Sequence, residues 1–128
     1  MSSPTNSIQT VTSLHLEAEV SRLTDLAQRI RDSGPVAPVN CWIEDYTVTR
    51  QTGPYHYKRV NSDRPQFGAR GQARTLHLGK AGSPDHQDWQ QRLKRRDALT
   101  EIDYRVGLIR QLMARQQSHP LWMPDPLP

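Results

Sequence analysis

Basic side chains crowd the middle third of the chain. Residues 50–80 hold seven Lys and Arg against one acid, Asp63, which gives a net charge of +6, whereas the whole chain of 128 residues carries +4. The planar guanidinium of Arg can bond two oxygens of one phosphate or carboxylate. A localised cationic stretch beside a nearly neutral remainder is typical of nucleic-acid binding, and a solvated basic loop would have the same composition. The seven are Arg50, Lys58, Arg59, Arg64, Arg70, Arg74 and Lys80.

Aromatic and histidine residues lie among these basic residues, and a second group of arginines lies further along the chain. Tyr55, His56 and Tyr57 stand directly before Lys58, where they could stack on bases or touch base edges while cations hold phosphates. Further along, Arg92, Arg95 and Arg96 share one side of a predicted helix and are expected to add phosphate contacts. The alternative is a solvated helix face, in which Asp88 pairs with Arg92 one turn away for only about 0.3–0.5 kcal/mol.

Three short strands are predicted to carry the central residues. Residues 41–50 are rich in β-branched and aromatic types, residues 55–60 follow a Gly53-Pro54 break as a hairpin partner, and residues 74–78 alternate. Alternation predicts that Leu76 and Leu78 face a core while His77 faces the other way. The thirteen residues 61–73 between the second and third strands form a loop long enough to be functional or disordered.

Two helices are predicted to flank the strands. In residues 13–33 apolar positions recur every three or four residues, with Ser13 as N-cap and Gly34-Pro35 at the end. The second helix begins at Ser83-Pro84 and runs to about residue 117. Its apolar stripe over 99–113 points about 140° away from Trp89 and Leu93. We therefore expect the second helix to cover the sheet first and to change partner near Asp97, pairing beyond it with the first helix or with a second copy.

These elements predict an α+β protein: an N-terminal helix, a small three-stranded antiparallel sheet, and a long C-terminal helix that pairs with the first. The expected organisation is a disordered start (1–12), a single domain (13–117) and a proline-rich extended tail (118–128). Trp122 in that tail is a candidate anchor for a protein partner, and folding back on the protein's own core is the alternative. A homodimer through the helical seams is a further candidate assembly.

Catalytic and cofactor chemistry finds little support in the sequence. The Gly79-Lys80 pair lacks the first glycine and the Ser/Thr of a nucleotide-binding P-loop. Gly79, Lys80, Gly82 and the N–H groups after Ser83 could still hold one phosphate, and a plain tight turn is the alternative. Cys41, His56 and His77 lack the spacing of a zinc site. We expect no metal, no cofactor and no enzymatic activity. One cysteine, no secretory signal and no long apolar run predict a cytoplasmic protein without a membrane span.

Residues 41–96, three strands followed by a helix with aromatics and arginines on the strands, resemble the small AP2-like DNA-binding domain at the front of tyrosine recombinases. In that family the three-stranded sheet lies in the major groove. The resemblance implies that Tyr46, Arg50, Tyr55, Tyr57 and Arg59 read bases or contact phosphates and that Trp89 packs the helix on the sheet. The string HLGKAGSPDHQDWQQRLKRR also resembles small cyanobacterial proteins, which implies no function.

The expected function is therefore non-catalytic binding of nucleic acid, with DNA favoured over RNA. A protein–protein adaptor is the rival hypothesis, in which the helical seams and the tail bind a larger complex and the arginines only confer solubility. An enzyme subunit would need a partner chain to supply its missing groups.

Overall fold

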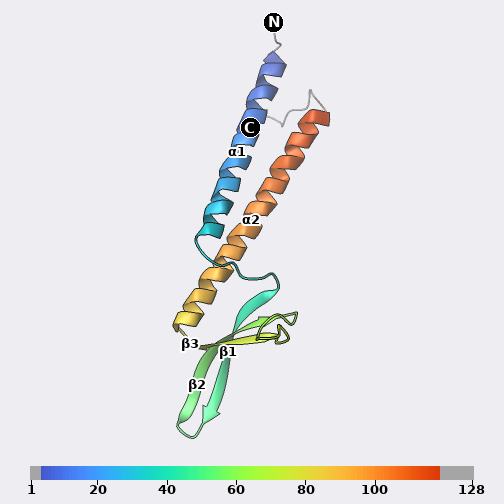
Figure 1. Ribbon diagram of the computed structural model, residues 1–128. Coiled ribbons are helices and arrows are strands. Elements are labelled where there is room, and N and C mark those ends of the chain that lie inside the picture. The colour runs from blue at the N-terminus through green and yellow to red at the C-terminus, as the bar shows by residue number, and fades with distance from the viewer. Residues whose placement is uncertain (1–3, 119–128) are drawn as a thin grey trace. The chain divides into compact units, whose positions relative to one another are not determined.

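The computed structural model describes residues 4–118 and has two long helices and one sheet. Their order is α1 (Pro4–Asp32), β1 (Cys41–Arg50), β2 (Gly53–Ser62), β3 (Thr75–Lys80) and α2 (Pro84–Ser118) (Figure 1). The contacts divide the chain into a helical unit, Met1–Asp32 with Ala98–Pro128, and a sheet unit, Ser33–Asp97. The predicted α+β class and element order are confirmed. The expected tail, Trp122 included, lies outside the described residues.

The helical unit is an antiparallel pair formed by α1 and the later turns of α2. Leu23 and Ala27 of α1 are buried against Ile102 and Val106 of α2. These residues belong to the two seams that the spacing predicts, so the predicted pairing of α1 with the later turns of α2 is confirmed. However, α1 begins at Pro4, so Ser13 lies inside the helix rather than at its N-cap; its hydroxyl donates to Gln116 Oε1 at 2.9 Å.

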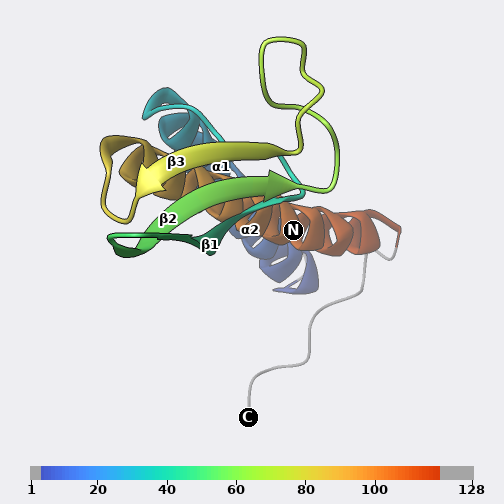
Figure 2. The same ribbon diagram turned by 90° about the horizontal axis from the view of Figure 1, so that it is seen from below.

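The sheet unit contains a three-stranded antiparallel sheet in the order β1-β2-β3, and the earlier turns of α2 pack on one of its faces (Figure 2). Val60 is fully buried in a core with Leu78, Phe67 and Trp89, and Leu93 packs against that core. The Trp89 and Phe67 rings meet edge to face at 5.8 Å. As predicted, α2 therefore changes partner at the boundary between Asp97 and Ala98.

The β1–β2 hairpin extends past β3 as a two-stranded ribbon. Arg50 pairs with Gly53 across a two-residue turn, and β2 begins at Gly53 rather than after the Gly-Pro pair. β3 pairs only with Tyr57–Asn61 of β2, so the earlier part of β2 has β1 as its sole neighbour among the described strands. Pro54 is tolerated there because this part of β2 has no second neighbouring strand to which the missing N–H of proline would have to donate.

Candidate nucleic-acid interface

The strand register decides which sheet residues share a face. Cross-strand partners in an antiparallel pair point to the same side, and neighbours along a strand to opposite sides. His56 and Lys58 therefore share the face of buried Val60, which α2 covers. The other face, which we call the aromatic face, carries side chains from all three strands: Trp42, Glu44, Tyr46, Arg50, Tyr55, Tyr57, Arg59 and His77.

The centre of the aromatic face is tied together by its own contacts. The Tyr46 ring stacks on Tyr57 at 5.6 Å, and the Arg59 guanidinium lies over the Tyr46 ring at 4.9 Å. A hydrogen bond of 3.0 Å joins the Tyr46 hydroxyl to His77 Nδ1. With Tyr57 and Arg59 packed against its ring, Tyr46 is positioned to stiffen the sheet more than to stack on a base.

Two acids neutralise the cations in the middle of the sheet. Arg59 forms an ion pair with Glu44 at 3.1 Å, and Lys58 forms one with Asp45. The Lys58 ammonium, through its hydrogen bond and charge, holds the pKa of Asp45 below its usual value. The strong positive charge expected at Lys58 and Arg59 is thus reduced within the sheet itself.

Five of the predicted phosphate-contacting residues keep their charge unpaired. Among the ten Lys and Arg predicted to contact phosphate, these five are exposed and form no ion pair with another residue in the range 4–118; the five unpaired cations are Arg50, Arg64, Arg70, Arg74 and Lys80. Lys94, which was not predicted, is also exposed and without an ion pair in that range. Arg50 lies at the ribbon end, 5.7 Å from the Tyr55 ring centroid, and Lys80 ends β3 opposite Tyr57. All five belong to the sheet unit.

The loop between β2 and β3 is ordered and carries three of these cations. Phe67 and Ala73 exchange backbone hydrogen bonds of 2.9 Å, and Phe67 is anchored in the core. A turn closed by the Gly71 N–H on the Gly68 carbonyl, with Gly68 at φ 85°, places Arg70 at the loop tip. Figure 2 shows the loop extending from the end of the sheet where β2 ends and β3 begins.

The helix arginines bind their own chain. Arg92 pairs with Asp88 at 2.8 Å and covers the Trp89 ring at 5.0 Å. Arg95 donates to the Pro35 carbonyl at 3.0 Å and to Ser33, while Arg96 donates to the Cys41 carbonyl at 2.7 Å and to Pro38. Phosphate binding by these three stays a prediction, and the contacts give them a second role, which is to fix the segment between α1 and β1 on α2.

The start of α2 is capped as predicted. Ser83 Oγ accepts the His86 N–H at 3.2 Å, and the Gly82 N–H donates to His86 Nδ1 at 2.9 Å. The N–H groups of Gly82 and His86, two of those predicted to be able to bind a phosphate at this helix start, therefore already have hydrogen-bond acceptors within the protein.

Other kinds of site lack a geometric basis in the described part of the chain. Within residues 4–118 no three His, Cys, Asp or Glu residues gather as metal ligands; Cys41 is buried on the core face and His77 lies on the aromatic face. Burial raises the pKa of the Cys41 thiol, with Arg96 acting in the opposite direction. None of the described helices has an apolar stretch long enough to cross a bilayer.

Sequence reasoning left Trp42, Glu44 and His77 out of the site. A signal for Glu44 was present: once the hairpin turn is placed at Gln51-Thr52, counting back pairs Glu44 with Arg59 and Asp45 with Lys58. No protein-family model, curated protein or solved structure matches this chain.

Proposed function

We propose that the sheet unit binds duplex DNA, with the five unpaired cations contacting backbone phosphates. The observation that carries the proposal is the partition of charge. The sheet unit holds eleven Lys and Arg against six Asp and Glu, net +5, whereas the helical unit holds six against seven, net −1. Because the five cations have no carboxylate partner, contact with phosphate would not first require an internal ion pair to break.

The spacing of the cations suits an elongated polyanion. Arg50 marks one end of the sheet, and the loop with Arg64, Arg70 and Arg74 leaves the other end, nine residues along β2. At about 3.3 Å per residue the two ends are roughly 30 Å apart. One turn of B-DNA is about 34 Å long, so cations at both ends could meet phosphates about one turn apart.

The ribbon supports duplex DNA over duplex RNA. A two-stranded ribbon fits the major groove of B-DNA, whereas the major groove of an RNA helix is too deep and narrow for protein side chains to read. The free end of the ribbon bears Arg50 and Tyr55, both among the expected contact residues. The resemblance of residues 41–96 to AP2-like domains adds to this choice, because in that family a β-sheet lies in the major groove of duplex DNA.

Charge reversal in each unit tests the proposal. We would titrate a fluorescent duplex of about two helical turns at low salt with wild type, with Arg50→Glu/Arg70→Glu, and with the matched control Arg110→Glu/Arg115→Glu. The control makes the same charge change at exposed positions of the helical unit.

The expected result is a loss of more than tenfold in affinity for the sheet variant, equivalent to about 1.4 kcal/mol, and a smaller loss for the control. Equal losses would mean that net charge alone drives binding and would contradict the proposal. Parallel titrations with single-stranded DNA and duplex RNA that bind more tightly than duplex DNA would contradict the choice of ligand.

A further inference from the structure

The outer edge of β1 carries a row of unpaired backbone groups. In the strand order β1-β2-β3, β1 lies at one edge of the sheet (Figure 2). The Asp63 N–H donates to the Asn40 carbonyl at 3.2 Å, so even-numbered residues along β1 bond to β2 and odd-numbered ones point outward. Within residues 4–118 these outward groups have no hydrogen-bond partner; they are the N–H and C=O of Ile43, Asp45, Thr47 and Thr49.

The edge of β1 is open to another strand, whereas the edge of β3 is protected. Proteins block sheet edges with short strands, bulges, lysine or proline. β3 has six residues, ends at Lys80, and shifts its register with β2 between Lys58 and Arg59. β1 has ten residues without proline, lysine or a bulge, and Arg96 covers only its first carbonyl, that of Cys41. A further strand can therefore add to β1.

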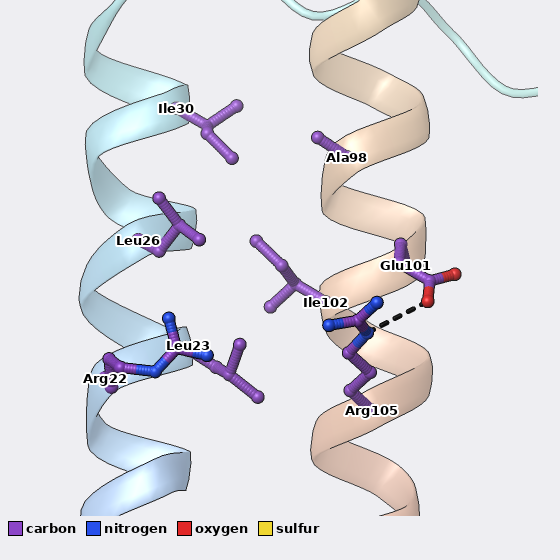
Figure 3. Close-up of a pocket in the computed structure, with 8 residues that line it drawn as sticks. All are labelled: Arg22, Leu23, Leu26, Ile30, Ala98, Glu101, Ile102 and Arg105. Carbon is purple, nitrogen blue, oxygen red and sulfur yellow. Dashed lines mark hydrogen bonds and ion pairs between the residues drawn. The ribbon is translucent and has the colours of Figure 1, made fainter.

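The helical unit presents a different kind of surface. In the interior of a helix the N–H and C=O groups bond to one another. The seam between α1 and the later turns of α2 has a shallow apolar groove lined by Leu23, Leu26 and Ile102, together with Arg22 and Arg105 (Figure 3). This groove offers side chains alone, whereas the edge of β1 offers directional donors and acceptors in a fixed register.

The strand β1 is complementary to itself when two copies pair antiparallel about a two-fold axis at Thr47. The outward groups then form about six backbone hydrogen bonds, two from each of three bonded pairs. Glu44 lies opposite Arg50 and Tyr46 opposite Val48 on the aromatic face, while Thr47 lies opposite Thr47 on the other face. Opposite charges, an aromatic beside a β-branched residue, and paired threonines are all combinations that stabilise neighbouring strands.

Other registers lose the charge pair. With the axis one position earlier, Glu44 faces Val48 and Arg50 faces Trp42. Two positions earlier, Asp45 faces Asp45 of the second copy, and like charges directly opposite are destabilising. One position later, Glu44 falls opposite the hairpin turn. Side-chain pairing thus favours the axis at Thr47.

The charge of the sheet unit is distributed in a way that permits this contact. β1 itself holds Glu44, Asp45 and Arg50, net −1, although the sheet unit carries +5. The other four of the five unpaired cations lie beyond β2, in the loop and on β3. Repulsion between them is screened at about 0.15 M salt, where the Debye length is about 8 Å. Because Glu44 also pairs with Arg59, it does not neutralise Arg50 fully.

From the unpaired edge, its lack of protection and its self-complementary side chains we infer that β1 is a dimerisation strand. Its partner is β1 of a second copy, and the two sheets join into one sheet of six strands. The inference does not depend on DNA binding, and it places the aromatic faces of the two copies on the same side of one continuous sheet.

A cysteine on the two-fold axis tests the contact and its register together. In Thr47→Cys the two thiols belong to a bonded pair with Cα atoms about 5.5 Å apart, a distance that a disulfide can span. The matched control is Thr49→Cys, at another exposed threonine of β1, whose two copies would be roughly 13 Å apart. Under mild oxidation at about 0.15 M salt, Thr47→Cys should form a covalent dimer. Thr49→Cys and wild type, in which Cys41 is buried, should not.

Removal of one N–H tests the backbone bonds. In sedimentation equilibrium, wild type should have twice the single-chain mass of 14.7 kDa. Thr47→Pro removes a donor that points away from β2, so it should weaken the dimer at least tenfold and leave the hairpin bonds intact. The matched control, Thr47→Val, loses the same hydroxyl bond to His56 but keeps the N–H, and should remain dimeric.

Circular dichroism checks that every variant keeps its fold; where Thr47→Pro does not, the cross-linking decides. A monomeric wild type, a Thr49→Cys variant that cross-links as readily as Thr47→Cys, or a Thr47→Val variant as monomeric as Thr47→Pro would overturn the inference. None of these variants changes a cation proposed to contact DNA, so their failure would leave the DNA titration unaffected.

Discussion

At the scale of single residues, carboxylate and carbonyl oxygens of the protein itself determine which Lys and Arg side chains are left to bind an external anion. Glu44 and Asp45 occupy Arg59 and Lys58, while carbonyl oxygens of the segment between α1 and β1 occupy Arg95 and Arg96. Of the predicted phosphate contacts, those at the ribbon end, in the loop and at Lys80 remain without an ion pair. Residue type alone therefore overstates the phosphate-binding surface, since ten Lys and Arg residues were candidates and five are free of such contacts.

The pairing of Lys58 with Asp45 makes a prediction about pH. Because the pKa of Asp45 is lowered in the folded state, its stabilising contribution is present above the usual Asp pKa and is lost as the pH falls through the lowered value. Replacing Lys58 with Gln should raise the pKa of Asp45 towards its usual value. Carboxyl-carbon NMR titration of the two proteins checks this, and identical midpoints would show that the ion pair does not form in solution.

Gly34 lies directly against the Arg95 guanidinium. Its φ is 156°, and a Cβ added there would lie 2.6 Å from the Arg95 guanidinium carbon. Because the Arg95 head group is the end of a flexible side chain, it can move away from an added Cβ at the loss of its bonds to Ser33 and Pro35. We therefore expect Gly34→Ala to lower the free energy of unfolding by about 0.5–1.5 kcal/mol, as measured by urea denaturation. In an Arg95→Ala background the same substitution should cost less. An equal cost in both backgrounds would mean that Arg95 does not occupy this position.

At the scale of elements, the two helix seams, the three strands and the change of partner near Asp97 were all predictable. The spacing of apolar residues along the chain indicates each of them. Helical spacing separates Leu23 from Ala27 and Ile102 from Val106, and strand spacing separates Leu76 from Leu78. This spacing does not indicate which side chains contact each other across the fold. The ion pair of Glu44 with Arg59 requires the hairpin register, and the bonds from Arg95 to Ser33 join residues 62 positions apart.

The element boundaries that differ have local causes. Propensity placed the start of the second strand after Gly53-Pro54, at Tyr55, yet β2 begins at Gly53 because β3 does not reach that part of the strand and Pro54 loses no bond to it. The start of α1 at Pro4 agrees with the preference of proline for a first helical turn, a signal that the apolar spacing from residue 16 onward does not include.

Two glycines should respond in opposite directions to alanine although both face open space. Gly107 lies inside α2 without a positive φ, so Gly107→Ala should raise the free energy of unfolding by about 0.5–1 kcal/mol. Gly53 has φ 123° in the hairpin, a conformation that alanine rarely adopts, so Gly53→Ala should lower it. Thermal and urea denaturation measure both; a destabilising Gly107→Ala would mean that α2 is not a regular helix at that residue.

At the scale of the whole molecule, charge and apolar surface are divided between the two units. The sheet unit holds the entire positive excess, and the helical unit is nearly neutral and has the apolar groove. This division agrees with contact between the sheet unit and a polyanion.

The salt dependence of duplex DNA binding tests the central claim most directly. Every neutralised phosphate releases counterion and contributes about −0.9 to the slope of log K against log salt concentration, so contacts by all five unpaired cations predict a slope of about −4 to −5. Substituting Arg50 and Arg70 with Gln should reduce its magnitude by about 2. An absence of binding at low salt, a slope near zero, or a slope unchanged in that variant would contradict the account.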